Sequence, residues 1–190
     1  MSPPTAPYHH GDLPGTLVRA AIELLEEDGA ADLSLRAAAR RAGVSSAAPY
    51  RHFADRNELL SAVAAVGYRE LAADLIAANP TPTTAEGVAD IAVAYVRFAL
   101  KRPGMFRVMF AEGCDPDNAD RVSAVEVIHQ YLYSLVQQVI PSGDPEPLAT
   151  AAWALVHGLA FLHLDGKLDA SSDKVVAKRV RAAVRAILDR

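Results

Sequence analysis

SLRAAARRAGVSSAAPYRHFADR, residues 34–56, is the stretch that decides the fold, and it predicts two short helices joined by a tight turn. The hydroxyl group of Ser34 can cap the first helix. Gly43 follows that helix, where the backbone commonly takes a positive φ, and Ser45 can cap the second helix. Pro49 lacks an amide hydrogen, so we expect an irregular turn there. Together these features predict a helix-turn-helix, whose second helix usually enters the major groove of DNA.

The same stretch is basic although the chain is acidic. It contains five arginines and one aspartate, a net charge of +4, whereas the whole chain carries −4. A positive cluster on an acidic protein commonly neutralises phosphate groups. The alternative is a solvated, arginine-rich helix face without a partner. The turn residues beside the cluster favour DNA binding.

Three short motifs within residues 9–66 resemble the TetR/AcrR family of one-component transcriptional regulators: Gly43-Val-Ser, Tyr50-Arg-His-Phe and Asp55-Arg-Asn-Glu-Leu-Leu. The resemblance implies an all-α fold. It also implies an N-terminal three-helix helix-turn-helix DNA-binding domain joined to a larger C-terminal helical domain for ligand binding and dimerisation. The residues that it assigns to operator DNA are Arg36, Ser45, Ser46, Ala47, Tyr50, Arg51, His52 and Arg56. We expect Arg56 and Arg36 to anchor phosphates. Ser46, Arg51 and His52 are the candidates for base edges, and Tyr50 could serve either role.

Composition and patterning support this organisation. Alanine, leucine and valine dominate the chain, which favours helices, and Cys114 is the single cysteine, which fits a reducing cytoplasm. We expect a disordered arm over residues 1–11, a DNA-binding domain over 12–57 and a second domain over 58–190. His9 and His10 in the arm invite the hypothesis of a metal site, but a flexible arm along DNA is the preferred interpretation. No signal peptide and no membrane span are expected.

Helical spacing of apolar residues predicts the remaining elements. A first helix begins after Asp12 and ends at Gly29. A long helix runs from about residue 56 to residue 79 and belongs to both domains, so it can act as a lever between them. Further helices are expected over residues 84–102, 119–140, 146–165 and 171–189, with a short apolar segment over residues 105–110.

The last two helices predict a homodimer. No residue from Leu148 to Leu164 is an Asp, Glu, Lys or Arg, and apolar residues lie on all sides of that helix, so it needs cover on more than one face. A four-helix interface with a second copy would supply the cover, and a twofold dimer matches paired half-sites in DNA. The residues expected at this interface are Ala152, Val156, Leu159, His163, Val176, Val180, Val184 and Ile187.

Trp153, His157 and Gly158, preceded by the segment 102–110, resemble the WHG-type C-terminal domain of some TetR-type regulators. The resemblance implies that the second domain binds a small molecule or dimerises. Aromatic and methionine side chains suit a varied apolar effector. The candidate lining residues are Phe98, Phe106, Met109, Phe110, Tyr131, Leu135, Trp153, His157 and Phe161. The alternative is that these side chains simply fill the core.

Catalysis is the first competing function. Glu126-Val-Ile-His129 matches one unit of a di-iron helical bundle, but that chemistry needs two such units and the sequence contains no second one. No phosphate loop, nucleophile elbow or zinc-ligand spacing occurs either. We therefore expect no enzymatic activity and no cofactor. Two alternatives stay open: a ligand-independent dimeric DNA-binding protein, and an activator instead of a repressor.

Overall fold

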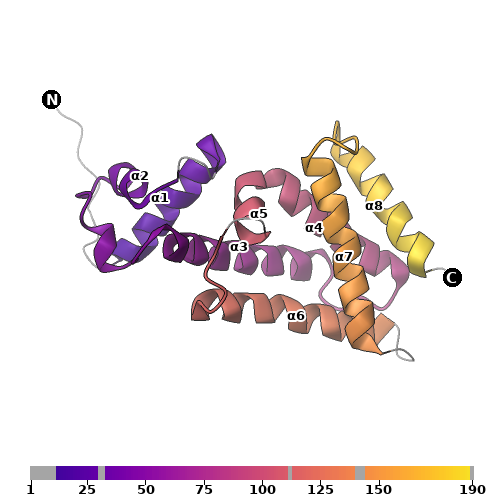
Figure 1. Cartoon of the computed structure of the whole chain (residues 1–190). Coiled ribbons are helices and arrows are strands. Elements are labelled where there is room, and N and C mark those ends of the chain that lie inside the picture. The colour runs from indigo at the N-terminus through magenta and orange to yellow at the C-terminus, as the bar shows by residue number, and fades with distance from the viewer. Residues whose placement is uncertain (1–11, 30–32, 111–112, 140–143, 189–190) are drawn as a thin grey trace.

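The computed structural model describes residues 12–29, 33–110, 113–139 and 144–188. Within these ranges the secondary structure is helical, without strands. The elements are α1 (Leu13–Asp28), α2 (Leu35–Arg41), a 3₁₀ turn η1 (Pro49–Arg51), α3 (Arg56–Ala78), α4 (Ala85–Lys101), α5 (Pro103–Phe110), α6 (Ala119–Val139), α7 (Pro145–Leu164) and α8 (Asp173–Leu188). Figure 1 shows α1 and α2 at one end of the molecule, with α3 running from them into the bundle of α4–α8. The expected arm over residues 1–11 lies outside the described residues.

Side-chain caps fix where the N-terminal helices begin. The carboxylate of Asp12 accepts a hydrogen bond from the Gly15 amide at 3.0 Å, and the Ser34 hydroxyl accepts one from the Ala37 amide at 3.1 Å. Asp55 accepts from the Glu58 amide at 2.9 Å. Each cap satisfies an amide that has no partner within its own helix. The predicted starts of α1, α2 and α3 are confirmed.

The turn after α2 has the glycine geometry that the sequence predicts. Gly43 has φ of 71°, and its amide donates to the Arg40 carbonyl at 3.2 Å. The Val44 amide donates to the Ala39 carbonyl at 3.0 Å. This pair of bonds is a Schellman motif, which ends a helix and turns the chain sharply.

The second helix of the helix-turn-helix is shorter than the sequence led us to expect. It is a single 3₁₀ turn, Pro49–Arg51, because Pro49 has no amide to bond the carbonyl of the preceding turn. The His52 and Phe53 amides both donate to the Pro49 carbonyl at 2.9 Å. Pro49 itself is buried, so it anchors this irregular turn against the rest of the domain.

α3 is the helix that both halves of the molecule share. It packs against α1 at one end and against α4, α5 and α6 farther along. A Cβ atom at Gly67 would lie 2.6 Å from Sδ of Met109 and 2.8 Å from Sδ of Met105, so glycine allows α5 to approach α3 closely. The lever-like helix of the sequence analysis therefore has its middle fixed against α5.

α5 also joins the bundle to α1. The sequence predicted only an apolar segment here, whereas the structure has a helix that packs on both α1 and α3. A Cβ atom at Gly104 would lie 2.5 Å from the Leu25 carbonyl oxygen of α1. Just before α5, Arg102 donates from Nε to Glu26 at 2.9 Å and from Nη1 to Glu70 at 2.6 Å. These contacts connect α1, α3 and the start of α5.

Candidate DNA interface, effector cavities and dimer face

The helix-turn-helix presents a continuous set of exposed side chains. α2 packs against η1, so their outer surfaces adjoin. Of the eight residues expected at DNA, seven are exposed: Arg36, Ser45, Ser46, Ala47, Tyr50, Arg51 and His52. Exposed serine, tyrosine, histidine and arginine side chains can donate hydrogen bonds to phosphates and base edges. The arrangement therefore fits contact with duplex DNA.

The arginines of this region divide into two groups. Arg41 donates to Glu23 at 3.3 Å and also pairs with Glu27 of α1, whose hydrogen bond raises the pKa of Arg41. Arg36 and Arg51 make no side-chain hydrogen bond or ion pair with any described residue. Arg41 thus fastens α2 to α1, while Arg36 and Arg51 keep their positive charge available to an external anion.

Arg56 differs from the other residues expected at DNA. It is half-buried, and its Nε donates to the Leu33 carbonyl oxygen at 2.9 Å. This bond ties the start of α3 to the segment before α2. Arg56 therefore has a structural role, and its predicted phosphate contact stays a prediction.

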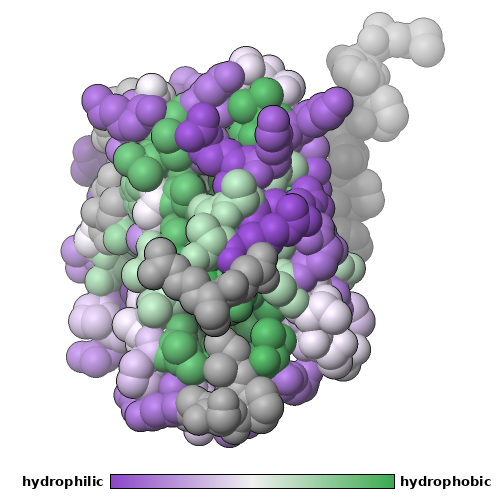
Figure 2. Space-filling view, turned by 90° about the vertical axis from the view of Figure 1, so that its right-hand side faces the viewer, coloured by the Kyte–Doolittle hydropathy of each residue, from purple (hydrophilic) through white to green (hydrophobic). Residues whose placement is uncertain are grey.

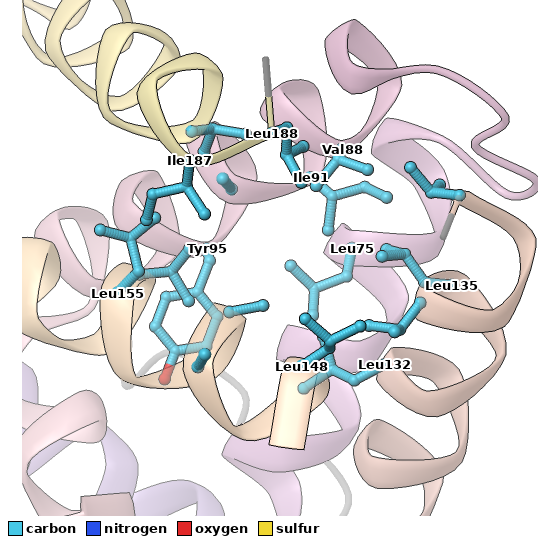
Figure 3. Close-up of a pocket in the computed structure, with 17 residues that line it drawn as sticks. Leu75, Val88, Ile91, Tyr95, Leu132, Leu135, Leu148, Leu155, Ile187 and Leu188 are labelled. Carbon is cyan, nitrogen blue, oxygen red and sulfur yellow. The ribbon is translucent and has the colours of Figure 1, made fainter. Parts of the chain in front are cut away.

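A first cavity, which we call the distal cavity, has a volume of about 430 Å³ and lies among α3, α4, α6, α7 and α8. Figure 3 shows side chains from these helices around an open centre, with the Tyr95 hydroxyl at its edge. Tyr95 supplies the one polar side chain of the lining. Of the nine residues proposed for an effector, only Leu135 lies here. The lining residues are Leu75, Val88, Ile91, Ala92, Tyr95, Leu132, Leu135, Val136, Val139, Leu148, Ala151, Ala152, Leu155, Val156, Val184, Ile187 and Leu188.

A second cavity, the proximal cavity, has a volume of about 550 Å³ and lies nearer to the start of α3. Three of the proposed effector residues, Met109, Phe110 and Trp153, line it. Its wall is more polar than that of the distal cavity because arginine, glutamate and histidine contribute to it. The lining residues are Tyr68, Leu71, Tyr95, Met109, Phe110, Pro116, Arg121, Val122, Val125, Glu126, Ile128, His129, Leu132 and Trp153.

The other proposed effector residues lie outside both linings. Phe98 and Phe106 are buried in the core, and Phe161 packs on Phe106 with ring centroids 5.5 Å apart. Tyr131 donates its hydroxyl hydrogen to the Asn79 carbonyl at 2.7 Å, and burial raises its pKa to about 12. These side chains hold the bundle together, as the core-filling alternative requires.

Trp153 and His157 converge on one hydroxyl group. Nε1 of Trp153 donates to the Tyr95 hydroxyl at 3.4 Å, and that hydroxyl lies 3.0 Å from Nδ1 of His157. Burial lowers the pKa of His157, so the imidazole is neutral near pH 7. A neutral ring can accept the Tyr95 hydrogen at Nδ1, which satisfies all three groups.

Three residues of the cavity walls, Arg121, Tyr68 and Tyr95, were not predicted from the sequence. Arg121 does carry a signal in the sequence, because it falls on the stripe of α6 that turns inward. It precedes Ala124 and Ile128, both buried, at the spacing of one helix face. A charged residue in an inward stripe is a recognisable sign of a polar site.

Most of the side chains expected at a dimer interface are covered within one chain. Leu159, His163, Val176, Val180 and Val184 are buried, because α7 and α8 both pack on α4. Ala152 and Val156 are half-buried, and Ile187 is 58% exposed. The apolar stripe of α8 thus serves the core, and a dimer contact through Ala152, Val156 and Ile187 stays a prediction.

α7 has an uncovered apolar face of its own. Its exposed residues include Ala151, Ala154, Gly158 and Leu162, which share one side of the helix. Figure 2, in which the right-hand side of Figure 1 faces the viewer, shows hydrophobic side chains gathered in the middle of that end of the molecule, between hydrophilic ones. By length and composition, α7 is the one helix among the described residues that could cross a membrane, and only 17% of its apolar window is buried. An exposed apolar face of this kind is typical of an interaction surface.

The di-iron alternative gains no support from the geometry. Within the described ranges, no group of three or more His, Cys, Asp or Glu side chains is placed to hold a metal ion. Glu126 and His129 are both exposed on α6, and Glu126 accepts a hydrogen bond from Gln130.

Known proteins are similar to this chain along most of its length. Residues 17–63 match the family described as bacterial regulatory proteins, tetR family, and residues 88–187 match the tetracyclin repressor-like C-terminal domain. A curated relative, the HTH-type transcriptional regulator BetI of Brucella canis, is 26% identical over 156 residues, or 79% of each chain.

Solved structures have the same architecture. A protein of unknown function from Rhodococcus sp. RHA1 is 35% identical, with a TM-score of 0.78 over 96% of this chain and 98% of that one. The TetR family regulator PfmR from Thermus thermophilus is 18% identical, with a TM-score of 0.65 over 90% and 93% of the two chains, and it supports the fold alone.

Proposed function

Because the chain belongs to the TetR family of transcriptional regulators, a family of DNA-binding proteins that are not enzymes, we propose that it is a cytoplasmic repressor. In this proposal a homodimer binds operator DNA and leaves it when a small molecule occupies the C-terminal bundle. No cofactor takes part. The WHG-type subdivision of the second domain stays a prediction.

The proposed DNA binding rests on the exposed surface of the helix-turn-helix. Arg36 lies on α2 and Arg51 on η1, and both side chains are exposed and make no hydrogen bond or ion pair with a described residue. Two such charges beside exposed serine, tyrosine and histidine side chains suit a surface that both neutralises phosphates and contacts bases. We assign Arg36 to phosphate and Arg51 to base edges.

The uncovered face of α7 supports a homodimer. Ala151, Ala154 and Gly158 are small, so two copies of α7 can approach closely along this stripe. The exposed side of α8 is a poorer candidate, since it carries Lys174, Lys178 and Arg179. Burying these charges against a second copy would require partners for them. We therefore place α7 at the centre of the interface.

α5 supplies a physical route from the cavities to the DNA-binding domain. Met109 and Phe110 at its end line the proximal cavity, whereas Gly104 at its start touches α1. A molecule that displaces the end of α5 would also move its start. The bonds from Arg102 to Glu26 and Glu70 would carry that movement to α1 and α3.

Selection from chromosomal DNA tests the proposal. Immobilised full-length protein is mixed with sheared DNA from its host, and the retained fragments are sequenced. We expect enrichment of a few loci that share a palindromic motif, and loss of that enrichment in the Arg36→Ala, Arg51→Ala double variant. Retention of random fragments, equal in the two proteins, would contradict sequence-specific regulation.

A further inference from the structure

The proximal cavity contains a cation without an anionic partner among the described residues. Arg121 lies on the inward stripe of α6, and its Nε is buried without a hydrogen-bond partner in that part of the chain. No described carboxylate forms an ion pair with it. An arginine keeps its charge inside a protein, so a partly desolvated guanidinium that lacks a counter-ion is costly unless an anion reaches it.

The other polar groups of the cavity already have partners. The Tyr68 hydroxyl donates to the Met109 carbonyl at 2.7 Å, and the Tyr95 hydroxyl is shared between Trp153 and His157. Glu126 is exposed and bonded to Gln130. His129 is also exposed, with its ring 6.1 Å from that of Trp153. Arg121 interacts with Tyr68 but has no carboxylate partner among the described residues, so its remaining N–H groups are the donors that a bound molecule would use.

The positive charge of Arg121 decides whether the cavity suits a cationic or an anionic ligand. Aromatic walls such as Tyr68, Phe110 and Trp153 can attract a cation. Here, however, Arg121 already occupies that position, because its Cζ lies 5.9 Å from the centroid of the Tyr68 ring. A second cation would meet the repulsion of Arg121. An anion would instead gain a charge-assisted, bidentate pair with the guanidinium.

The other residues of the cavity wall indicate the chemistry of the rest of the bound molecule. Met109, Phe110, Ile128 and Leu132 surround the space with apolar surface. We infer that the proximal cavity binds a monocarboxylate with a long apolar body, the carboxylate on Arg121 and the body against α5 and Trp153. This inference rests on the proposed function, since it names the class of effector.

Trp153 gives a direct readout that needs no DNA. It is the single tryptophan of the chain and it lines this cavity, so its fluorescence reports on occupancy. The full-length protein is titrated with decanoate, decanol and decyltrimethylammonium, which share one apolar chain and differ in the charge of the head. We expect decanoate to bind about tenfold or more tightly than decanol, and the cation to bind more weakly than either.

Three variants test whether Arg121 causes the preference for decanoate over decanol. Arg121→Gln should bind decanoate and decanol equally, while Arg121→Lys should keep part of the preference because it keeps the charge and loses the planar fork. Arg69→Gln is the matched control, since Arg69 is exposed on α3 and pairs with Asp120, and it should keep the full preference. Circular dichroism confirms that each variant folds.

The outcomes separate this inference from the proposed function. Equal affinity for decanoate and decanol in the unaltered chain, no response to decanoate, or a preference that survives in both Arg121 variants would overturn the carboxylate site. Decanoate that binds through Arg121 without changing DNA affinity supports the site and contradicts the proposed release mechanism.

Discussion

The hydroxyl oxygen of Tyr95 lies 3.0 Å from Nδ1 of His157, and this contact joins α4 to α7. Tyr95 lines both the distal and the proximal cavity, so the bonded pair stands in the wall between them. The same hydroxyl accepts a hydrogen bond from Trp153, which borders the proximal cavity. A molecule that enters either cavity would therefore press on one hydrogen-bonded cluster.

Replacing Tyr95 by phenylalanine should destabilise the fold. The change keeps the ring and removes the hydroxyl, so Nδ1 of His157 and Nε1 of Trp153 both lose a partner. Leaving a buried polar group unsatisfied costs about 1–3 kcal/mol, and because His157 is half-buried and Trp153 is partly exposed, we expect the free energy of unfolding to fall by about 1 kcal/mol, the lower end of that range. Chemical denaturation of the Tyr95→Phe variant measures it. Tyr133→Phe, at an exposed tyrosine on α6, is the control, and equal stability of the two variants would refute the role of the cluster.

Acid should weaken the bundle through two of its histidines, the half-buried His157 and the buried His163. Burial lowers the pKa of His157, and burial together with the charge of Arg179 lowers that of His163, while Asp169 opposes the shift. The unfolded chain therefore takes up protons before the folded chain does. The stability that these groups provide is complete above the ordinary histidine pKa of about 6.5 and is lost as the pH falls below it.

Denaturation at about pH 7.5 and about pH 5.5 measures this effect. The unaltered chain should unfold more easily at the lower pH, and His163→Leu should show a smaller difference. His52→Gln, at an exposed position of the DNA-binding domain, should behave as the unaltered chain does. An identical pH dependence in His163→Leu and the unaltered chain would show that His163 does not contribute.

Replacing Arg36 and replacing Arg51, two of the exposed arginines of the helix-turn-helix, should have different effects on DNA binding. Arg36→Ala should weaken binding to all duplexes and flatten the dependence of log affinity on log salt by about one unit, as loss of one phosphate contact does. Arg51→Ala should reduce discrimination between the selected site and a scrambled one by about 1–3 kcal/mol. Lys174→Ala removes the same charge from α8 and should change neither quantity. The assignment would be wrong if the two arginine variants were indistinguishable in both measurements.

A single substitution on α7 should separate the two copies. Gly158 is exposed, and a Cβ atom there would have nothing within 4 Å in one chain. Glutamate favours a helix more than glycine does, so Gly158→Glu should leave the monomer folded. Two copies that pack against each other through the exposed face of α7 would instead have to bury the charge of that glutamate. Sedimentation should show a monomer for Gly158→Glu and a dimer for Gln137→Glu, which adds the same charge on α6; dimers of both variants would exclude the α7 interface.

The sequence predicted the parts of the fold that depend on local chemistry. Ser34, Asp12 and Asp55 act as caps because each is followed by an amide that needs a partner, and Gly43 has the positive φ that its turn requires. The irregularity at Pro49 also followed from a missing amide. These features involve neighbours within a few residues, so the sequence carries them directly.

The candidate sites were harder to predict because periodicity identifies a buried face without naming its neighbour. Val176, Val180 and Val184 form the stripe that was expected, but they pack within their own chain. The aromatic residues proposed for an effector likewise divide between the core and the proximal cavity. Which side chains border a cavity depends on how five helices meet, and that information is spread over the whole sequence.

A footprint on an isolated genomic fragment tests the central claim most directly. Full-length protein without added effector is bound to a retained fragment in dilute salt, and the protected bases and the number of bound chains are determined together. The account predicts paired, symmetric half-sites about 34–36 Å apart or a multiple of it, with an even number of chains on each site. A single unpaired half-site occupied by one chain, or no protection of any duplex, would contradict it.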